Sequence, residues 1–322
     1  MGTGLTAEQQ VIQRQLSMRA ILWDMKKTET MDVSKLFGEA ELFQVRMVSV
    51  CRQAAGQEEQ DVYQSALQEL CSFGMLEAQA LLVTEDAGLA EYVYKMRDAQ
   101  AYSQAGAPAG MAVVYYEPPN WRSKALADMI VLGFEEIGIQ FLDRVHKRRN
   151  HLPWNILYTK RTCVREITMA DLDELYALYE GEGITDYTEP LFERQEEEEY
   201  TKSYIANMYY YYGYGMWVVR DRQTGALLGR AGIERREVNA EVCMELGYII
   251  GREYQNKGYA TEVCRAIMDY AKEELAIRRL HCFIHPCNTV SVHLARKLGF
   301  ELCADQDGGQ EELAHWKKCL QE

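Results

Sequence analysis

Short apolar runs alternate with amphipathic stretches through the first half of the chain. Three of these runs predict buried strands, at residues 80–84 (ALLVT), 111–116 (MAVVYY) and 129–132. Apolar positions that recur near a helical period predict helices at residues 61–75, 89–96 and 136–148. Residues 1–76 hold few Gly or Pro and predict helix throughout. Strands that alternate with helices indicate a small α/β domain with a parallel sheet over residues 1–150.

Strands predominate in the second half, which indicates a second α/β domain over residues 162–322. Predicted strands cover residues 163–168, 216–220, 227–235, 242–250, 280–284, 300–303 and 312–318. Predicted helices cover residues 168–179, 191–209, 259–275 and 289–298. Thr168 and Asp171 form a pattern similar to a capping box, and residues 221–225 (DRQTG) predict a hairpin turn. This order predicts a mixed sheet flanked by helices.

A basic segment at residues 146–161 connects the two predicted domains. Its basic residues besides His146 are Lys147, Arg148, Arg149, His151, Lys160 and Arg161. Residues 152–157 (LPWNIL) are apolar, so we expect the segment to pack rather than to form a free linker. Basic clusters are most often solvated, and this is the interpretation that we favour here. Contact with a phosphate or an acidic partner is the alternative.

Composition narrows the classes of function. The chain has 322 residues, enough for two domains, and its apolar fraction of 48% can supply a sizeable core. Acidic residues exceed basic ones, 49 against 35, for a net charge of −14. This balance argues against general nucleic-acid binding, although a local basic patch could still hold a phosphate ligand. The composition leaves the oligomeric state open.

Cysteine usage and apolar run lengths suggest where the protein is found. The nine cysteines are an odd number without a C-x-x-C pair, so neither a disulfide framework nor a zinc site is predicted. The first residues show no basic segment followed by an apolar core, and no run is long enough to span a bilayer. We therefore expect a cytoplasmic protein with reduced thiols, no metal and no membrane partner.

The strand predicted at residues 242–250 is followed by a turn, residues 255–260 (QNKGYA), and then by a helix. Amides at a helix N-terminus have no intrahelical partner and lie at the positive end of the helix dipole. Gly258 lets the backbone approach a ligand closely, because it has no Cβ. Neither G-x-x-x-x-G-K-[ST] nor G-x-G-x-x-G occurs here. The pattern therefore predicts a different turn that holds a diphosphate.

Gln255, Gly258 and Ala260 form a Q-x-x-G-x-A motif that resembles the pyrophosphate loop of the GNAT acyltransferases. Residues 288–300 are similar to that family's N-x-x-S-x-x-L-x-x-K-x-G-F segment and follow at the expected distance. The resemblance covers about residues 163–320 and is strongest to the branch that includes the ribosomal-protein N-terminal acetyltransferases. It implies a GNAT domain that transfers acetyl from acetyl-coenzyme A to a primary amine. The acceptor would be a protein or peptide N-terminus, or a small-molecule amine.

The resemblance also implies a set of cofactor-binding residues. Gln255, Asn256, Lys257, Gly258, Tyr259, Ala260 and Thr261 would surround the pyrophosphate, and Arg252 and Lys257 would add positive charge. The pantetheine arm would add to the strand edge at Tyr248, Ile249 and Ile250, where a backbone N–H would point at the thioester carbonyl. Asn288 would contact the pantetheine arm or the substrate, and capping of the following helix is its simpler role.

Acetyl transfer to an amine needs a group that takes a proton from the acceptor and a group that protonates the departing thiolate. Glu245, in the strand before the loop, is the first candidate base, and its alternative is an exposed strand carboxylate. Glu234 is the second candidate and could instead hold the substrate's ammonium group. Many GNAT enzymes have a Tyr where this chain has Ala295. Ser291, one turn earlier, is therefore the candidate acid, against a role as a surface or capping serine.

Two further features of this half leave alternatives open. Cys282 and Cys287 lie close in sequence to His281 and His285, so a Cys–His relay is an alternative to direct transfer, which we favour. The acidic run at residues 193–199 and the tyrosines of residues 209–214 flank the place where related enzymes admit substrate. They could attract and pack a cationic amine, although such charge runs are usually solvated.

The first half has a weaker resemblance, to the haloacid-dehalogenase-like domains. Residues 21–25 (ILWDM) resemble that family's first motif, and Glu85 and Asp86 lie where its acidic fourth motif would be. Phosphohydrolases of that family use a D-x-D pair, but Lys26 occupies the second acidic position here. The resemblance thus implies a domain without hydrolytic activity, and an unrelated accessory domain is the alternative. Two rivals to an acetyltransferase follow: a non-catalytic acetyl-coenzyme A sensor, and a protein with residual phosphohydrolase activity.

Overall fold

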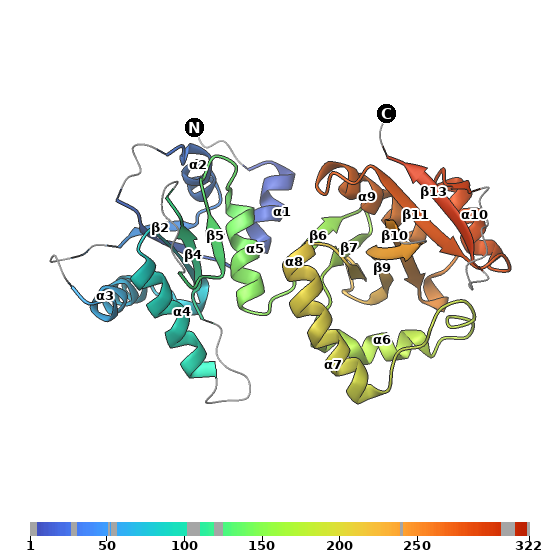
Figure 1. The fold of residues 1–322 in the computed structure, drawn as a ribbon, viewed down its shortest axis with the longest axis horizontal. Coiled ribbons are helices and arrows are strands. Elements are labelled where there is room, and N and C mark those ends of the chain that lie inside the picture. The colour runs from blue at the N-terminus through green and yellow to red at the C-terminus, as the bar shows by residue number, and fades with distance from the viewer. Residues whose placement is uncertain are drawn as a thin grey trace. The chain divides into compact units, whose positions relative to one another are not determined.

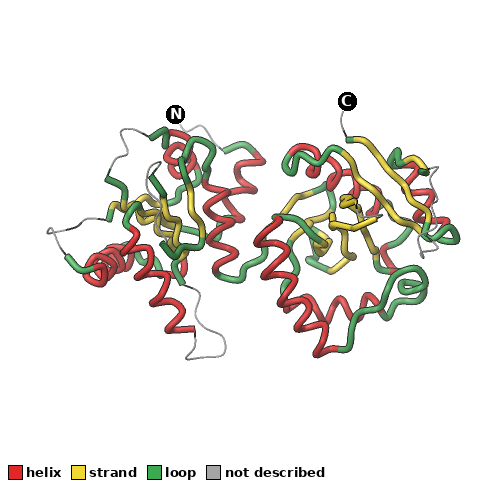
Figure 2. The backbone as a smooth tube through the Cα atoms, in the orientation of Figure 1, coloured by secondary structure: helices red, strands yellow, loops and turns green. Residues whose placement is uncertain are grey.

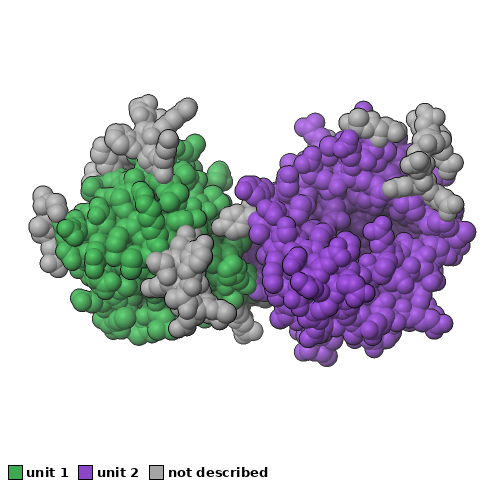
Figure 3. Space-filling model, turned by 60° about the horizontal axis from the view of Figure 1, so that its bottom comes forward, with its two compact units in different colours: residues 1–152 green, residues 153–322 purple. Residues whose placement is uncertain are grey.

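The computed structural model describes residues 5–26, 31–50, 52, 57–101, 110–118, 125–238, 241–303 and 313–320. The chain divides into two compact units, Met1–Leu152 and Pro153–Glu322 (Figure 3). Within the described residues, none of the helices combines the length and the apolar character that crossing a membrane requires.

The first unit is built on a parallel five-stranded sheet with the strand order β2-β1-β3-β4-β5. The strands are β1 (Ala20–Asp24), β2 (Arg46–Ser49), β3 (Ala80–Thr84), β4 (Ala112–Tyr116) and β5 (Met129–Val131). The helices are α1 (Ala7–Gln15), α2 (Ser34–Leu42), α3 (Glu59–Ser72), α4 (Ala87–Ala101) and α5 (Ile139–Arg149), with a 3-10 turn at Glu77–Gln79. Figure 2 shows this sheet between helices. The predicted parallel α/β architecture is confirmed.

Both faces of this sheet are buried. Ile21 and Trp23 pack on one side with residues of α2 and α5, whereas Ala20 and Leu22 pack on the other with α3 and α4. Strands covered on both faces read as continuous apolar runs rather than as an alternating pattern. The expectation of helix throughout residues 1–76 is therefore wrong. The residues of β1 and β2 were predicted as helix, because neither segment contains a Gly or Pro that would interrupt a helical pattern.

The basic segment after this sheet begins inside a helix and is partly buried. Lys147 of α5 is 6% exposed, and its Nζ lies 2.8 Å from Oδ2 of Asp143. His146 is 1% exposed and lies 2.9 Å from Oγ of Ser17 through Nδ1. Burial lowers the pKa of His146. The prediction of a solvated cluster is wrong for these two residues, because the apolar stripe of α5 carries them into the interior.

Asp143→Ala is expected to destabilise the first unit by about 3–5 kcal/mol, because Lys147 would remain buried without its carboxylate partner. The same carboxylate accepts hydrogen bonds from the backbone N–H groups of Ser17 and Met18, at 2.8 and 3.0 Å. Urea unfolding of the full chain measures the loss. Glu91→Ala breaks an exposed ion pair with Lys95 and serves as the control, with an expected cost below about 1 kcal/mol. Equal effects of the two changes would contradict the prediction.

The second unit is an eight-stranded mixed sheet with the order β12-β13-β11-β10-β9-β8-β7-β6. The strands are β6 (Asn155–Tyr158), β7 (Thr162–Arg165), β8 (Met216–Asp221), β9 (Leu227–Val238), β10 (Glu241–Ile250), β11 (Arg279–Ile284), β12 (Glu301–Leu302) and β13 (Ala314–Cys319). The α-helices are α6 (Leu172–Tyr179), α7 (Arg194–Tyr204), α8 (Tyr210–Tyr212), α9 (Tyr259–Glu273) and α10 (Thr289–Lys297). Single 3-10 or π turns lie at Met169–Asp171, Ile205–Tyr209 and Arg252–Tyr254. The predicted mixed sheet flanked by helices is confirmed (Figure 1).

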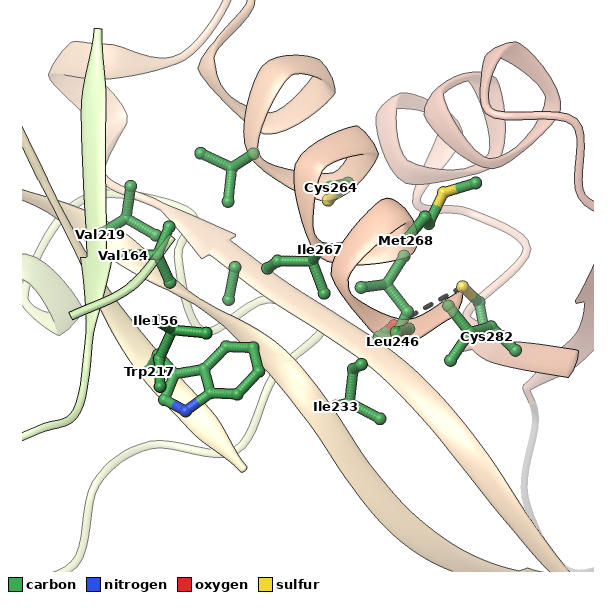
Figure 4. Packing of buried hydrophobic residues seen from close by; sticks show 14 of the residues in the cluster. Ile156, Val164, Trp217, Val219, Ile233, Leu246, Cys264, Ile267, Met268 and Cys282 are labelled. Carbon is green, nitrogen blue, oxygen red and sulfur yellow. Dashed lines mark hydrogen bonds between the residues drawn. The ribbon is translucent and has the colours of Figure 1, made fainter. Parts of the chain in front are cut away.

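One face of this sheet is fixed against α9. Figure 4 shows side chains of the strands, among them Ile233 and Leu246, that meet Cys264, Ile267 and Met268 of the helix. Buried positions of α9 recur at helical spacing, at Val263, Cys264, Ile267, Met268 and Ala271. This stripe holds the helix firmly on the sheet, and it therefore also fixes the turn that leads into the helix.

Candidate functional site

The turn between β10 and α9 presents unpartnered amides to one side of the sheet. Gly258 is the N-cap of α9 and has φ +81°, a left-handed conformation that glycine adopts without strain. Asn256 has φ +57°, which completes the sharp turn. Because the N-cap residue is a glycine, it has no side chain that could cap the first amides of α9. The first N–H groups of α9 lie at the positive end of the helix dipole, where the sequence predicts an anion site.

A pocket of about 690 Å³ opens beside this turn. The predicted site residues that line it are Tyr248, Ile249, Ile250, Arg252, Gln255, Asn256, Gly258, Tyr259, Ala260, Thr261, Asn288 and Ser291. Lys257 lies outside the lining, with its Nζ 5.7 Å from the centre of the Tyr254 ring. Glu234 and Glu245 are also outside it. The structure thus brings the expected cofactor residues except Lys257 together in one pocket, with the carboxylates placed elsewhere.

The polar side chains of the pocket also shape its walls. Gln255 donates from Nε2 to the backbone carbonyl of Ile250 at 3.0 Å, which ties the turn to the end of β10. Asn288 is the N-cap of α10, and its Oδ1 accepts from the N–H of Ser291 at 3.1 Å. The capping role considered for Asn288 is therefore present in the structure. Its position in the pocket lining is compatible with a second role toward a ligand.

Sequence reasoning missed several residues of this pocket. His293 and Lys297 of α10 line it together with a loop at residues 182–188. Lys297 belongs to the quoted C-terminal motif and lies on the helix face of Val290 and Leu294, so helical spacing could have identified it. The loop has no motif. It reaches the pocket because Tyr187 donates from its hydroxyl to the backbone carbonyl of Cys287 at 3.3 Å.

The strands beside the pocket diverge. Parallel strands β10 and β11 are paired in register at Glu245 and His281, and no further pair follows toward Ile250 and Ile284. The edge of β10 at residues 246–250 is therefore not covered by β11 through a regular ladder. Cys282 closes the start of the gap, since its Sγ donates to the backbone carbonyl of Leu246 at 3.5 Å. A splayed strand edge of this kind can pair with the amides of an extended ligand.

Ser291 lies at this gap together with a buried phenol. The hydroxyl of Tyr248 is buried and makes no hydrogen bond of normal geometry to another described residue. Burial raises the pKa of Tyr248, and the nearby Ser291 hydroxyl opposes this rise. Ser291 itself lines the pocket. Ser291 and Tyr248 are therefore neighbours in the pocket.

The candidate bases share one face of the sheet. Glu245 is directly opposite Glu234 in the antiparallel pair of β10 and β9, so both side chains point to the same side. That side is opposite to the one on which Leu246 meets α9, because successive strand residues alternate. Oε2 of Glu245 accepts from Arg236 at 3.2 Å, and Oε1 of Glu234 accepts from the hydroxyl of Tyr204 at 2.7 Å. Glu245 is thus ion-paired with a guanidinium, whereas Glu234 is hydrogen-bonded to a phenol.

A Cys–His relay through Cys282 finds no support in the geometry. Cys282 is 5% exposed, and burial raises the pKa of its thiol. Nδ1 of His281 lies 2.7 Å from Nε2 of His315, not beside a thiol. Burial and the neighbouring His315 lower the pKa of His281 to about 4. This imidazole pair is therefore neutral at pH 7, and Cys282 behaves as a core residue.

The acidic run at residues 193–199 and the tyrosines of residues 209–214 include both buried and exposed side chains. Glu197 of α7 is 3% exposed and accepts from the N–H of Phe192 at 3.1 Å, whereas its neighbours on the same helix are mostly exposed. Tyr209 is buried, and its hydroxyl donates to the backbone carbonyl of Met216 at 2.6 Å. Tyr211 is exposed. The exposed members remain candidates for contact with an acceptor.

The first unit has a polar cluster at the ends of β1 and β3. Oδ2 of the buried Asp24 accepts from the Thr84 hydroxyl at 2.6 Å. Arg52 Nη2 lies 2.6 Å from Asp86 and 3.9 Å from Asp24, so the two carboxylates share one guanidinium. Within the described part of the chain, groups of three or more His, Cys, Asp or Glu that could hold a metal ion do not occur.

Comparisons with known proteins locate a family in the second unit. Residues 161–301 match the model of the acetyltransferase (GNAT) domain. The uncharacterized protein YkkB of Bacillus subtilis is 35% identical over 88 residues, which are 27% of this chain and 51% of YkkB. The chain therefore spans about half the length of that relative. The uncharacterized N-acetyltransferase YoaA of Bacillus subtilis is 28% identical over 152 residues, which are 45% of this chain and 82% of YoaA.

Solved structures match the same part of the chain. An acetyltransferase from Agrobacterium tumefaciens is similar with a TM-score of 0.44 and 23% identity, and the match covers 50% of this chain and 92% of that one. The family match leaves the first unit outside its bounds.

Proposed function

The second unit contains a GNAT acetyltransferase domain, at residues 161–301, and from this premise we propose that the protein transfers acetyl from acetyl-coenzyme A to a primary amine. The observation that carries the proposal is the pocket where the uncapped N-terminus of α9 meets the splayed edge of β10. Such a pocket provides donors for a diphosphate at one end and for an amide-containing arm at the other.

The phosphate end of acetyl-coenzyme A would rest on the amides of residues 258–261. These amides lack a side-chain cap, and the helix dipole adds positive potential at the same place. Arg252 and Lys297 line the pocket and would supply full positive charges. In a chain with a net charge of −14, this local arrangement gives an anion a favourable place to bind.

The acyl end would lie along β10. The pantetheine amides would pair with the backbone of Tyr248–Ile250, and a strand N–H would donate to the thioester carbonyl. The same donor becomes more valuable when negative charge develops on that oxygen during attack. No side chain is needed for this stabilisation, which agrees with a pocket lined partly by strand backbone.

The chemistry needs a neutral amine. We assign Glu245, directly or through a water molecule, to take the proton from the acceptor's ammonium group. The amine's lone pair then attacks the thioester carbon, a C–N bond forms, and the C–S bond breaks. The departing thiolate takes the proton of the Ser291 hydroxyl, and the second proton that the nitrogen loses on becoming an amide returns, directly or through water, to the Ser291 oxygen. Glu234 would hold the acceptor's positive charge from the opposite strand position before the proton is lost.

Ser291→Ala is expected to lower kcat by about 10- to 100-fold, because the thiolate would lose its proton donor. The KM for acetyl-coenzyme A should stay near the wild-type value, since Asn288 and the backbone contacts remain. Thiol release measures both quantities. Thr289→Ala changes an exposed hydroxyl on the same helix and is the control. A wild-type kcat for the Ser291 variant would refute its role as the acid.

The class of acceptor is inferred from the two carboxylates, Glu234 and Glu245, that we place beside the acyl group. Glu234 and Glu245 favour a cationic amine, which includes a protein or peptide N-terminus and small-molecule amines. The same negative charge disfavours nucleic acid as a partner. A panel of amines and N-terminal peptides, followed by thiol release, tests the proposal. Binding of acetyl-coenzyme A without release of thiol across the whole panel would instead support a non-catalytic sensor.

A further inference from the structure

Arg161 holds the predicted phosphate-binding turn from outside the pocket. It lies in the hairpin between β6 and β7, far from the turn in sequence. Its Nε lies 2.7 Å from Oε2 of Glu262, and its Nη1 donates to the backbone carbonyl of Lys257 at 2.9 Å. The guanidinium carbon lies 4.1 Å from the centre of the Tyr259 ring. One side chain thus contacts three of the residues that form the turn and the first part of α9.

The contact with Lys257 determines which way an amide points. In a trans peptide the C=O and the following N–H point in opposite directions, and the structure has no cis peptide bonds in its described residues. Since the carbonyl of Lys257 points at Arg161, the N–H of Gly258 points the other way. Gly258 lines the pocket. Arg161 therefore aims this N–H at the space that a phosphate would occupy.

The contact with Glu262 removes a competing charge. Glu262 lies in the first turn of α9, where its carboxylate could compete with a phosphate for the helix N-terminus. Its Oε1 accepts instead from the Thr159 hydroxyl at 2.6 Å and from the Arg161 N–H at 2.9 Å. Burial opposes ionisation, but these hydrogen bonds prevail and lower the pKa of Glu262. The ionised carboxylate is held at the hairpin, away from the turn.

We propose that Arg161 is a positioning residue for the phosphates of the thioester, acting by orienting the peptide after Lys257 and by neutralising Glu262. The inference rests on the proposed function, because it assumes that the turn binds these phosphates. It adds a residue outside the pocket lining, contributed by the first hairpin of the second unit, to the binding of the cofactor.

Calorimetric titration of acetyl-coenzyme A into the full-length variants tests this role. Arg161→Ala is expected to raise the Kd by about 10- to 100-fold, because charge-assisted hydrogen bonds to the turn are lost. The kcat at saturating acetyl-coenzyme A should stay within about threefold of wild type, since Arg161 is remote from the acyl end. Arg161→Lys keeps the charge but not the forked geometry, and it should recover only part of the affinity.

A double variant separates the two contributions. Glu262→Gln alone should change the Kd by less than about threefold, whereas Arg161→Ala with Glu262→Gln should bind more tightly than Arg161→Ala alone. Arg222→Ala is the matched control. Its guanidinium supports the same hairpin by donating to the backbone carbonyl of Thr159 at 2.8 Å, but no contact with the turn is recorded for it. Its Kd should equal that of wild type.

The outcomes distinguish this inference from the proposed function. A wild-type protein that does not bind acetyl-coenzyme A would refute the proposed function. If wild type binds and Arg161→Ala binds equally well, only the role of Arg161 is refuted. An equal loss in Arg222→Ala, or no recovery in the double variant, would also refute it. If Arg161→Ala does not fold, Arg161→Lys and Glu262→Gln still provide the comparison.

Discussion

Ala260→Glu is expected to raise the Kd for acetyl-coenzyme A by about 100-fold or more, because a carboxylate would face the pyrophosphate. Ala260 is the second residue of α9 and lines the pocket. The change should not harm the fold, since an acidic side chain in the first helical turn interacts favourably with the helix dipole. Loss of binding together with an unchanged melting temperature would therefore locate the phosphates at this turn.

The control for this change is Ala260→Ser, which adds a small polar group without charge and should leave the Kd within a few-fold of wild type. Calorimetry measures both constants. A Glu variant that binds acetyl-coenzyme A as wild type does would contradict the placement of the diphosphate, and with it the proposed use of the pocket. High salt should weaken the difference between the two variants only partly, because the charges would lie close together.

Glu245→Gln is expected to lower kcat by about 10²- to 10⁴-fold, because the amide cannot accept the acceptor's proton. The Kd for acetyl-coenzyme A should not change, since Glu245 lies outside the pocket lining. The Gln side chain keeps the size of Glu and can still accept the hydrogen bond from Arg236. Stopped assays of thiol release at saturating acetyl-coenzyme A measure the rate.

Glu241→Gln removes an exposed carboxylate from the same strand and is the matched control, with an expected kcat equal to wild type. If Glu245→Gln retains the full rate, the assignment of the base is wrong. A selective loss in Glu234→Gln would then move the role to the opposite strand. A large loss in both carboxylate variants with an unchanged Kd would support their joint action.

Local determinants made the pocket predictable from sequence. Three parts of the pocket follow one another in the chain: the end of β10, Gly258 and the first turn of α9. One short sequence motif therefore identifies them together. The second motif is also a single segment, from Asn288 to the end of α10. The packing of α9 on the sheet then brings residues of both segments to one place. In such a site, residues that are neighbours in the sequence are also neighbours in the structure, so the sequence alone can identify them.

Long-range contacts were not predictable in the same way. Arg161 and Glu262 are 101 residues apart, and nothing in the local pattern of either residue indicates the other. Lys147 looked like a member of a solvated basic cluster because its partner Asp143 was not recognised. The strand β1 was assigned to helix, because full burial on both faces removes the alternation by which a strand is recognised. The strand β2 lies at the sheet edge with Val48 as its one buried residue, so it gave no alternation either.

In the proposed binding mode, the single register pair between β10 and β11 would limit the size of the group that can be transferred. The strand backbone would form hydrogen bonds with the pantetheine arm of the cofactor. These hydrogen bonds would not depend on the length of the acyl chain beyond the carbonyl. In the proposed binding mode, that chain would point toward the place where the two strands pair, at Glu245 and His281. There the contact of Cys282 with the carbonyl of Leu246 closes the space. In that binding mode a chain longer than acetyl would have to break this contact, so we expect a preference for short acyl groups that arises from the geometry of two strands.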